Sequence, residues 1–282
     1  IGGIGHSGST LLNLILGTSP KSFSLGEVKP LQYFLKEENP NEMFKNKEFT
    51  CTCGKKLREC PFWSVTPPYV EENLIPYKSK LSEKGKALSK TLFNKSIETA
   101  EKEDGNLFED LLQRARRIKG AQIRHLIDSS KDLVRACYLD DINQINVTIV
   151  HLVRDGRAVV NSYEKRGKGW VPTVVSWVVT NTLFSLLGKK DGIDYVQTSY
   201  DQIVQDEQEI EVLAEKLGVD VQAEKIAEAV NNEEYHNFAG NQMRHEDLDE
   251  IYYDDSWKEE LSWWKQKILT LLCYIPNQVW VY

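Results

Sequence analysis

The chain opens on a glycine-rich segment, GIGHSGST at residues 3–10, whose composition suits a phosphate-binding loop. Glycines let a loop curl so that its backbone N–H groups point inward, and a helix that begins there adds a partial positive charge. The Walker pattern G-x-x-x-x-G-K-[ST] fits the two glycines and Thr10, but Ser9 stands where that pattern has lysine. The basic residue here is His6, two positions before the second glycine. The segment therefore predicts an anion site that differs from an ordinary NTPase loop.

A second polar segment, RDGRAVVNSY at 154–163, follows an apolar run at 147–153. Arg154 ends the run, and Ser162 lies eight positions later on an expected helix. A guanidinium fork together with a hydroxyl suits a phosphate group. The alternative for Arg154 is a surface ion pair with a neighbouring acid such as Asp155.

In this order and at this separation, the two segments resemble the donor-binding segments of sulfotransferases, which use 3′-phosphoadenosine-5′-phosphosulfate. In that family a basic residue before a [ST]-G-[ST]-[ST] run belongs to the loop that binds the 5′-phosphosulfate, and His6 takes the basic place here. An arginine and a serine eight positions apart bind the 3′-phosphate. The resemblance implies sulfuryl transfer to a hydroxyl or amine acceptor, without a metal. The donor-binding residues that it implies are Gly5, His6, Ser7, Gly8, Ser9, Thr10, Arg154 and Ser162.

The resemblance extends to three later segments. TSYDQIVQD implies that Tyr200 lies near the adenine, and GNQMR implies that Gly240, Asn241 and Arg244 close over the 3′-phosphate. Lys131, after a predicted strand, would contact the sulfuryl oxygens. The alternatives are a helix-capping aromatic for Tyr200, ordinary turn chemistry for the glycine–asparagine pair, and a first-turn surface residue for Lys131.

Glu27 is the candidate general base. SLGEV at 24–28 resembles the GE segment of tyrosylprotein sulfotransferases, whose glutamate takes the acceptor proton at nearly the same distance from the loop. The alternative is an acidic residue in the first turn of a helix, which the helix dipole favours. If Glu27 is only such a residue, His6 inherits the role of base, so the expected catalytic residues are Glu27, His6 and Lys131.

These residues need a fold that gathers them. Apolar segments at 1–4, 22–26, 123–128, 147–153 and 193–199 are predicted strands, and helical stretches follow most of them. Such alternation predicts an α/β fold, a parallel sheet flanked by helices of the P-loop type, whose ligands bind at the carboxyl ends of the strands. We expect one domain over 1–282, with a helical and cysteine-containing insertion at about 30–120.

Several connecting elements are also predicted. Residues 80–118 are expected to form helices of a lid or cap, and 231–256 a long polar loop. The segment after 199 is expected to be one helix that ends at Gly218, and a final helix is expected over about 257–273.

The composition limits the class of partner. The chain has 282 residues and a net charge of −7, which argues against a broad basic face for nucleic acid. No stretch of 18 apolar residues is visible, so no membrane span is expected. The sequence begins inside an expected structural element with no initiator Met or signal-like region, so a trimmed chain is expected. If it is complete, a cytoplasmic location follows.

Cys51, Cys53 and Cys60 cluster in CTCGKKLRECPFW. A zinc site normally needs four ligands, and no fourth Cys or His lies nearby in the sequence. We therefore expect no metal, and three states remain open: a zinc site, a disulfide of Cys60 with Cys51 or Cys53, and reduced thiols.

Two rival functions remain. A P-loop kinase or NTPase would use Asp128, at the end of RHLID, as a magnesium ligand. A catalytically inactive nucleotide-binding or scaffold module would bind the nucleotide without turnover. The acceptor class, whether tyrosyl protein, glycan, lipid or small phenol, stays open.

Overall fold

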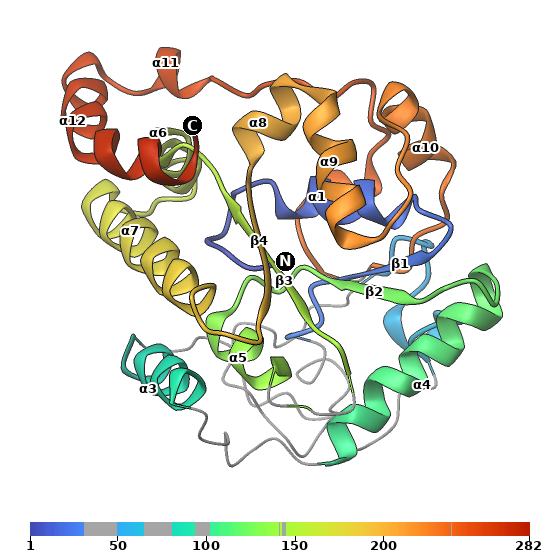
Figure 1. Ribbon diagram of the computed structural model, residues 1–282. Coiled ribbons are helices and arrows are strands. Elements are labelled where there is room, and N and C mark those ends of the chain that lie inside the picture. Colours follow the sequence, from blue (N-terminus) through green and yellow to red (C-terminus); the bar gives the residue numbers. More distant parts are fainter. Residues whose placement is uncertain (31–49, 65–80, 94–101, 141, 143–144, 238) are drawn as a thin grey trace.

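The computed structural model describes residues 1–30, 50–64, 81–93, 102–140, 142, 145–237 and 239–282 (Figure 1). The elements from the first half of the chain are α1 (Ser9–Gly17), β1 (Ser22–Gly26), the 3₁₀ turn η1 (Leu57–Glu59), α3 (Leu81–Leu92), α4 (Lys102–Lys119), β2 (His125–Asp128) and α5 (Leu133–Asp140). Those from the second half are β3 (Thr148–Val153), α6 (Gly156–Glu164), α7 (Trp170–Leu187), β4 (Asp194–Ser199), α8 (Tyr200–Gln205), α9 (Glu207–Leu217), η3 (Ala223–Lys225), α10 (Ile226–Asn232), η4 (Gln242–His245), α11 (Trp257–Glu260) and α12 (Trp263–Trp280).

The strands run parallel, as the alternation of strands and helices predicts. β1 pairs with β2 and β3 pairs with β4, each in parallel register. The start of the chain lies between these two pairs, because Gly2 forms parallel bridges to both Lys131 and His151. The α/β class with helices on a parallel sheet is therefore confirmed.

The predicted strand at 1–4 is shorter than expected. Only Gly2 forms β-bridges there, donating to Val150 O at 2.8 Å and accepting from Leu152 N at 3.0 Å, while Ile1 O accepts from Lys131 N at 3.1 Å. Gly3 has a φ of 136°, and a Cβ there would lie 2.4 Å from the backbone O of Leu152. The chain must leave the extended conformation at this glycine, and this turn starts the loop that leads to α1.

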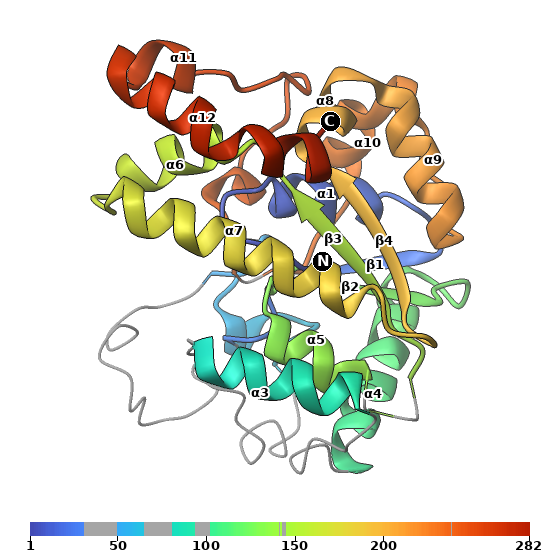
Figure 2. The same cartoon turned by 60° about the vertical axis from the view of Figure 1, so that its left-hand side comes forward.

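Helices cover both faces of the strands (Figures 1 and 2). On one face α1, α8, α9 and α10 pack around Val150 and Leu152 of β3. On the other, α3, α5 and α7 pack around Ile149, with Phe184 of α7 fully buried. Because side chains alternate along β3, this one strand supplies apolar groups to both cores.

Helix α7 is 18 residues long and apolar enough, by length and composition, to cross a membrane. Core helices of globular proteins share this property. Here Trp177, Phe184 and Leu187 are fully buried, whereas Val171 and Val175 on the same helix are about half exposed. The expectation that the chain has no membrane span stays a prediction.

Two helix boundaries differ from the sequence-based expectation. The segment after residue 199 forms two helices, because Asp206 takes an extended conformation and its side chain accepts from Gln208 N, which caps α9. Gly218 ends α9 in the left-handed conformation, as predicted. The last helix also divides, into α11 and α12, and α12 runs on to Trp280 because Cys273 and Val281 continue its contact with Trp177.

The described helices of the range 80–118, α3 and α4, do not form a lid. In both views α3 and α4 lie at the opposite end of the molecule from α8 and α11 (Figures 1 and 2). Helix α3 packs on α5 and α7, and Leu111 and Ala115 of α4 are fully buried beside Phe62. The apolar faces of α3 and α4 therefore pack in the hydrophobic core. The polar segment at 231–256 is a long connection, as expected, interrupted only by the end of α10 and by η4 in its described part.

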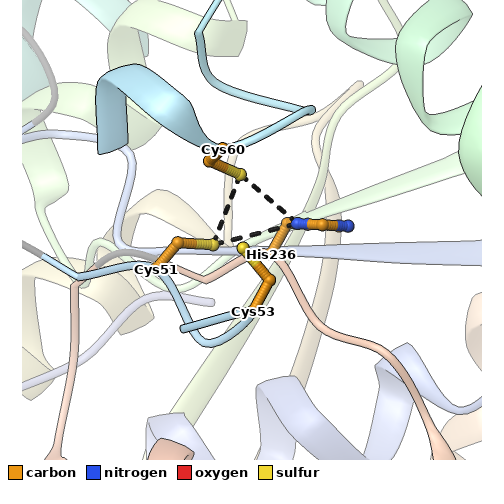
Figure 3. A group of neighbouring side chains, drawn as sticks. All are labelled: Cys51, Cys53, Cys60 and His236. Atoms are coloured by element: carbon orange, nitrogen blue, oxygen red, sulfur yellow. Dashed lines mark hydrogen bonds between the residues drawn. The ribbon is translucent and has the colours of Figure 1, made fainter. Parts of the chain in front are cut away.

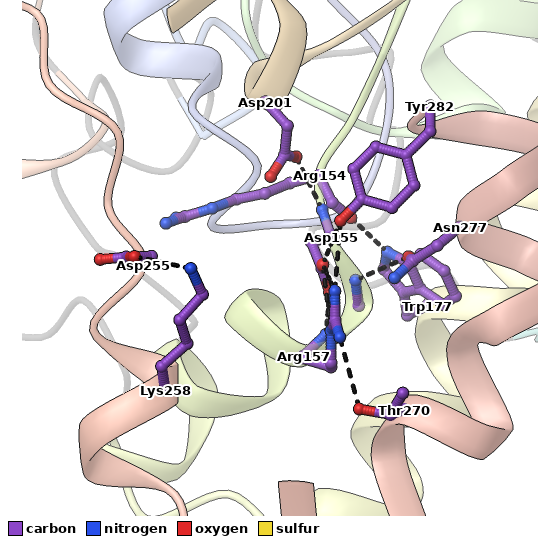
Figure 4. A network of polar contacts seen from close by, with 11 residues as sticks. Arg154, Asp155, Arg157, Trp177, Asp201, Asp255, Lys258, Thr270, Asn277 and Tyr282 are labelled. Carbon is purple, nitrogen blue, oxygen red and sulfur yellow. Dashed lines mark hydrogen bonds and ion pairs between the residues drawn. The ribbon is translucent and has the colours of Figure 1, made fainter. Parts of the chain in front are cut away.

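The turn between β3 and α6 is held by buried polar contacts (Figure 4). Asp155 is fully buried and caps α6, accepting from Arg157 N at 2.8 Å, and it also pairs with the Arg157 guanidinium. Trp177 Nε1 donates to Arg154 O at 3.0 Å, and Asn277 of α12 accepts from Gly156 N at 3.1 Å. Helices α7 and α12 therefore fix the backbone from which Arg154 projects.

We predict that Asp155→Ala destabilises the protein strongly, because it removes the fully buried carboxylate that caps α6 and pairs with the half-buried Arg157 guanidinium. Breaking a buried ion pair from one side costs about 3–5 kcal/mol, whereas an exposed pair contributes about 0–1 kcal/mol. Asp255→Ala is the matched control, since the Asp255–Lys258 pair is about half exposed. Urea unfolding measures the free energy of unfolding of both variants. Equal decreases in the two would contradict the role given to Asp155.

Candidate functional site

A cavity of about 600 Å³ opens where the strands end. Each of its main walls carries a residue that follows one extended segment: His6 after the start of the chain, Glu27 after β1, Lys131 after β2, Arg154 after β3 and Tyr200 after β4. The carboxyl ends of the strands thus bring together residues that are far apart in the sequence, as the fold class predicts.

Most of the residues predicted from the sequence line this cavity. They are Gly5, His6, Gly8, Ser9, Thr10, Glu27, Lys131, Arg154, Ser162, Tyr200, Gly240 and Asn241. Ser7 and Arg244 are the predicted residues that do not line it.

The loop at 3–8 leads into an uncapped helix. Gly8 is the N-cap of α1 with a φ of 84°, no side chain caps the helix, and its first turn holds no acidic residue. The first N–H groups of α1 and its partial positive charge therefore remain available to an anion. Ser7 is 1% exposed, and its Oγ has no hydrogen-bond partner in the described part of the chain.

Tyr200 connects the loop to two strand ends. A Cβ at Gly8 would lie 2.3 Å from its ring, so only glycine fits there, and the Arg154 guanidinium lies over the ring with its Cζ 4.4 Å from the centroid. The capping alternative for Tyr200 is wrong, because the Ser199 side chain caps α8 by accepting from Gln202 N at 3.1 Å.

Arg154 is 7% exposed and is oriented by several contacts. Its Nη1 donates to His6 O at 3.2 Å, and its Nη2 donates to Asp254 Oδ2 at 2.8 Å. The predicted alternative partner, Asp155, pairs with Arg157 instead. Arg154 Nε has no hydrogen-bond partner among the described residues. The guanidinium is thus held at the cavity wall with donor capacity left.

Ser162 lies in the last part of α6 and accepts from Arg166 Nη1 at its Oγ, 3.2 Å away. Arg166 also lines the cavity and was not predicted. Arg166 lies in the turn directly after α6, and its spacing of four residues from Ser162, about one helical turn, is the signal that could have found it. Tyr163, next to Ser162, packs its ring edge-on against His6, with centroids 4.7 Å apart.

His6 is half-buried among cations. Burial first, and then the charges of Arg166, Lys131 and Arg154, lower its pKa to about 4. The imidazole is therefore neutral near pH 7, unlike the lysine or arginine that the family has at this place. A bound anion would offset the neighbouring charges and raise the pKa.

Glu27 and Lys131 form an ion pair at the cavity wall, and their side chains are 23% and 16% exposed. Residues 27–30 are not helical, so the alternative of a first-turn acid for Glu27 is wrong. Lys131 has a φ of 61° and precedes α5, so the surface alternative for it is also wrong. Both residues are positioned at the site.

The loop at 239–245 covers one side of the cavity. Asn241 N donates to Thr10 Oγ1 at 3.2 Å, and a Cβ at Gly240 would lie 3.3 Å from the same oxygen. The Arg244 guanidinium donates to Gly240 O and Asn241 O, both at 2.9 Å. It therefore braces the loop from outside the cavity, a different position from the one predicted.

The three clustered cysteines are free thiols, and the disulfide alternatives do not occur in the structure. The structure also brings His236 to them, a fourth potential ligand that the sequence analysis missed. Its separation of 176 residues from Cys60 left no local signal. This group does not line the cavity.

Comparison with solved structures identifies the fold. Neither a family model nor a curated protein matches the chain. The sulfotransferase domain from the curacin biosynthetic pathway is similar over 96% of this chain and 98% of its own, with 17% identity and a TM-score of 0.50. A sulfotransferase domain from the Synechococcus PCC 7002 olefin synthase is similar over 91% and 80%, with 20% identity and a TM-score of 0.46. The chain has the sulfotransferase fold, as the resemblance predicted.

We predict that His6 titrates near pH 4 in the free protein and that pyrophosphate raises its pKa, because the anion offsets the charges of Arg166, Lys131 and Arg154. Histidine NMR measures both values, and His6→Asn assigns the signal; asparagine suits the φ of 67° at this position better than alanine does. A pKa near 6.5 that pyrophosphate leaves unchanged would contradict the described electrostatics.

Proposed function

We propose that this protein is a sulfotransferase that moves a sulfuryl group from 3′-phosphoadenosine-5′-phosphosulfate to a hydroxyl or amine acceptor. One observation carries the proposal. The loop at 5–10 and the pair Arg154 and Ser162, separated by some 150 residues, line a single cavity at the carboxyl ends of parallel strands. Both segments follow the family's donor-binding pattern, except that His6 stands where the family has lysine or arginine, and the fold is that of sulfotransferase domains.

The residues present fit the two phosphates of such a donor. The uncapped start of α1 and the hydroxyls of Ser9 and Thr10 suit the 5′-phosphate. Arg154 and Ser162, which both line the cavity, suit the 3′-phosphate. A volume of about 600 Å³ lies within the ordinary range of ligand pockets, about 300–1,000 Å³.

The transfer breaks the bond between sulfur and the phosphate oxygen and forms a bond between sulfur and the acceptor oxygen or nitrogen. The first-turn N–H groups of α1 stabilise the charge that develops on the departing phosphate. Glu27 takes the acceptor proton, and Lys131, which is paired with it, faces the same part of the cavity and stabilises the sulfuryl oxygens. His6, neutral before the donor binds, gains a proton as anionic charge enters the loop.

The kinase alternative is weakened by the position of Asp128. Its carboxylate accepts from Arg135 Nε at 2.6 Å and from Ser130 N at 2.9 Å, and Asp128 is absent from the cavity lining. The Arg135 guanidinium holds the pKa of this half-buried carboxyl below its usual range, although desolvation acts in the opposite direction. With these contacts, the Asp128 carboxylate stabilises the turn between β2 and α5 and is not placed to bind a magnesium ion.

We predict that the protein binds 3′-phosphoadenosine 5′-phosphate more tightly than AMP and that Arg154→Ala removes most of this preference. A charge-assisted hydrogen bond contributes about 1.5–3 kcal/mol, so bisphosphate affinity should fall about ten- to a hundred-fold. AMP affinity, measured by calorimetry on the same variant, is the control for damage to the cavity. Equal affinities for AMP and the bisphosphate in the wild-type protein would contradict the proposed donor.

We expect turnover in magnesium-free buffer at a rate that added Mg²⁺ does not change, because a sulfuryl group carries less charge than a phosphoryl group and needs less neutralisation. An acceptor screen with labelled donor supplies the assay. A rate that requires Mg²⁺ and falls in Asp128→Asn would favour the kinase, and donor binding without turnover on any acceptor would favour an inactive module.

We predict that Glu27→Gln lowers kcat by about 10²–10⁴-fold, the usual contribution of a positioned general base, while bisphosphate affinity stays nearly unchanged. Glu250→Gln is the control, because Glu250 lines the same cavity and this substitution removes the same charge. If Glu27→Gln turns over near the wild-type rate, Glu27 is not the base and His6→Asn becomes the variant to test.

A further inference from the structure

Cys51, Cys53, Cys60 and His236 form a compact group away from the cavity (Figure 3). Their potential ligand atoms all lie within 4.8 Å of one another. Cys51 and Cys60 are fully buried, His236 is 1% exposed, and Cys53 is half-buried. Three sulfurs and one imidazole nitrogen thus point at a common centre from two distant parts of the chain.

The spacing of these atoms suits a tetrahedral metal centre. Bonds of about 2.3 Å to sulfur and about 2.0–2.1 Å to nitrogen place the ligand atoms of a zinc tetrahedron about 3.6–3.8 Å apart. Here the Sγ atoms of Cys51 and Cys60 are 3.5 Å apart, and His236 Nδ1 lies 3.3 Å from Cys60 Sγ and 3.8 Å from Cys51 Sγ. A disulfide would need its sulfurs about 2.05 Å apart.

The backbone around the cysteines is shaped for thiolate sulfur. Gly54 N donates to Cys51 O at 2.9 Å, which closes the turn that presents Cys51 and Cys53 together. Backbone N–H groups of Phe62 and Trp63 donate to the sulfur of Cys60. Such N–H donors are the second-shell contacts that metal-bound ligands usually have.

The His236 imidazole is held in a fixed orientation. Its ring is stacked with Phe23 and Phe62, at centroid distances of 6.2 Å and 6.1 Å. Trp63 Nε1 donates to the backbone O of His236 at 2.5 Å. With Nδ1 directed at the sulfurs, Nε2 points away from them and has no hydrogen-bond partner among the described residues, the Glu234 Oε1 atom being 3.7 Å away.

We propose that Cys51, Cys53, Cys60 and His236 bind one zinc ion. Three thiolates and an imidazole favour zinc over the harder magnesium and calcium ions. Four protein ligands leave no open position, so the site is structural and takes no part in the transfer.

The ion would join two segments that have little regular structure of their own. The segment at 50–64 has only the turn η1 and one isolated bridge between Thr50 and Lys56, yet Cys51, Cys60, Phe62 and Trp63 within it are fully buried. Thr52 already links this segment to the polar segment at 231–256, because its backbone N donates to Asn237 O at 2.8 Å. From Asn237 the chain runs on to Asn241, which contacts Thr10 at the cavity. Zinc would therefore anchor the base of the loop that covers the cavity.

Metal analysis of the untagged full-length protein, produced in zinc-supplemented medium, tests the proposal. We expect about one zinc per chain after exhaustive dialysis, and sulfur-to-cobalt charge-transfer bands when Co²⁺ is added to reduced, metal-stripped protein. Chelation under native conditions should also make three more thiols reactive. Less than about 0.1 zinc per chain together with no cobalt bands would overturn the proposal. None of these readouts depends on sulfuryl transfer, so they are separate from the test of the proposed function.

The matched variants are Cys53→Ser and Cys137→Ser. Cys53 is the least buried ligand, so its loss disturbs the packing least, and Cys137 is fully buried in a different core. We expect zinc content to fall about tenfold or more in the first variant and to stay near one per chain in the second. Retention of one zinc in Cys53→Ser would overturn the assignment of Cys53. If that variant does not fold, the wild-type zinc, cobalt and thiol measurements decide the matter.

Discussion

The contact of the Tyr200 ring with Gly8 and Arg154 is the constraint on which the cavity depends. Gly8 has no room for a side chain because the ring lies against it, and the Arg154 guanidinium lies over the same ring. Gly8 is the N-cap of α1, Arg154 directly follows β3, and Tyr200 starts α8. One buried aromatic residue thus sets the distance between the loop suited to one phosphate and the arginine suited to another.

The rest of the fold maintains this arrangement. Helices α7 and α12 hold the backbone at Arg154 through Trp177 and Asn277 (Figure 4). The chain before η4 is fixed at several points, among them the Tyr235 hydroxyl, which donates to Leu14 O at 2.8 Å, and the Ser24 hydroxyl, which donates to Asn237 Oδ1 at 2.9 Å. The cavity is therefore largely preformed, which lowers the entropic cost of binding a ligand.

The sequence was sufficient for what depends on local pattern and on topology. Strands followed by helices predict a parallel sheet, and a parallel sheet brings Glu27, Lys131 and Arg154 to one edge however far apart they lie in the chain. It was insufficient where tertiary packing decides. His236 joins the cysteines and Asp254 pairs with Arg154 from the late polar segment, and no periodicity or spacing marks either contact. The lid was mispredicted because an amphipathic helix pattern gives no information on which surface the helix covers.

The most direct test of the central claim is a crystal structure of the protein with 3′-phosphoadenosine 5′-phosphate. We expect the 5′-phosphate at the start of α1, within hydrogen-bond distance of the backbone N–H groups of residues 8–10. The 3′-phosphate should contact Arg154 and Ser162, and Glu27 should face the space beyond the 5′-phosphate. A nucleotide bound with neither phosphate at these groups, or bound outside the cavity, would contradict the account.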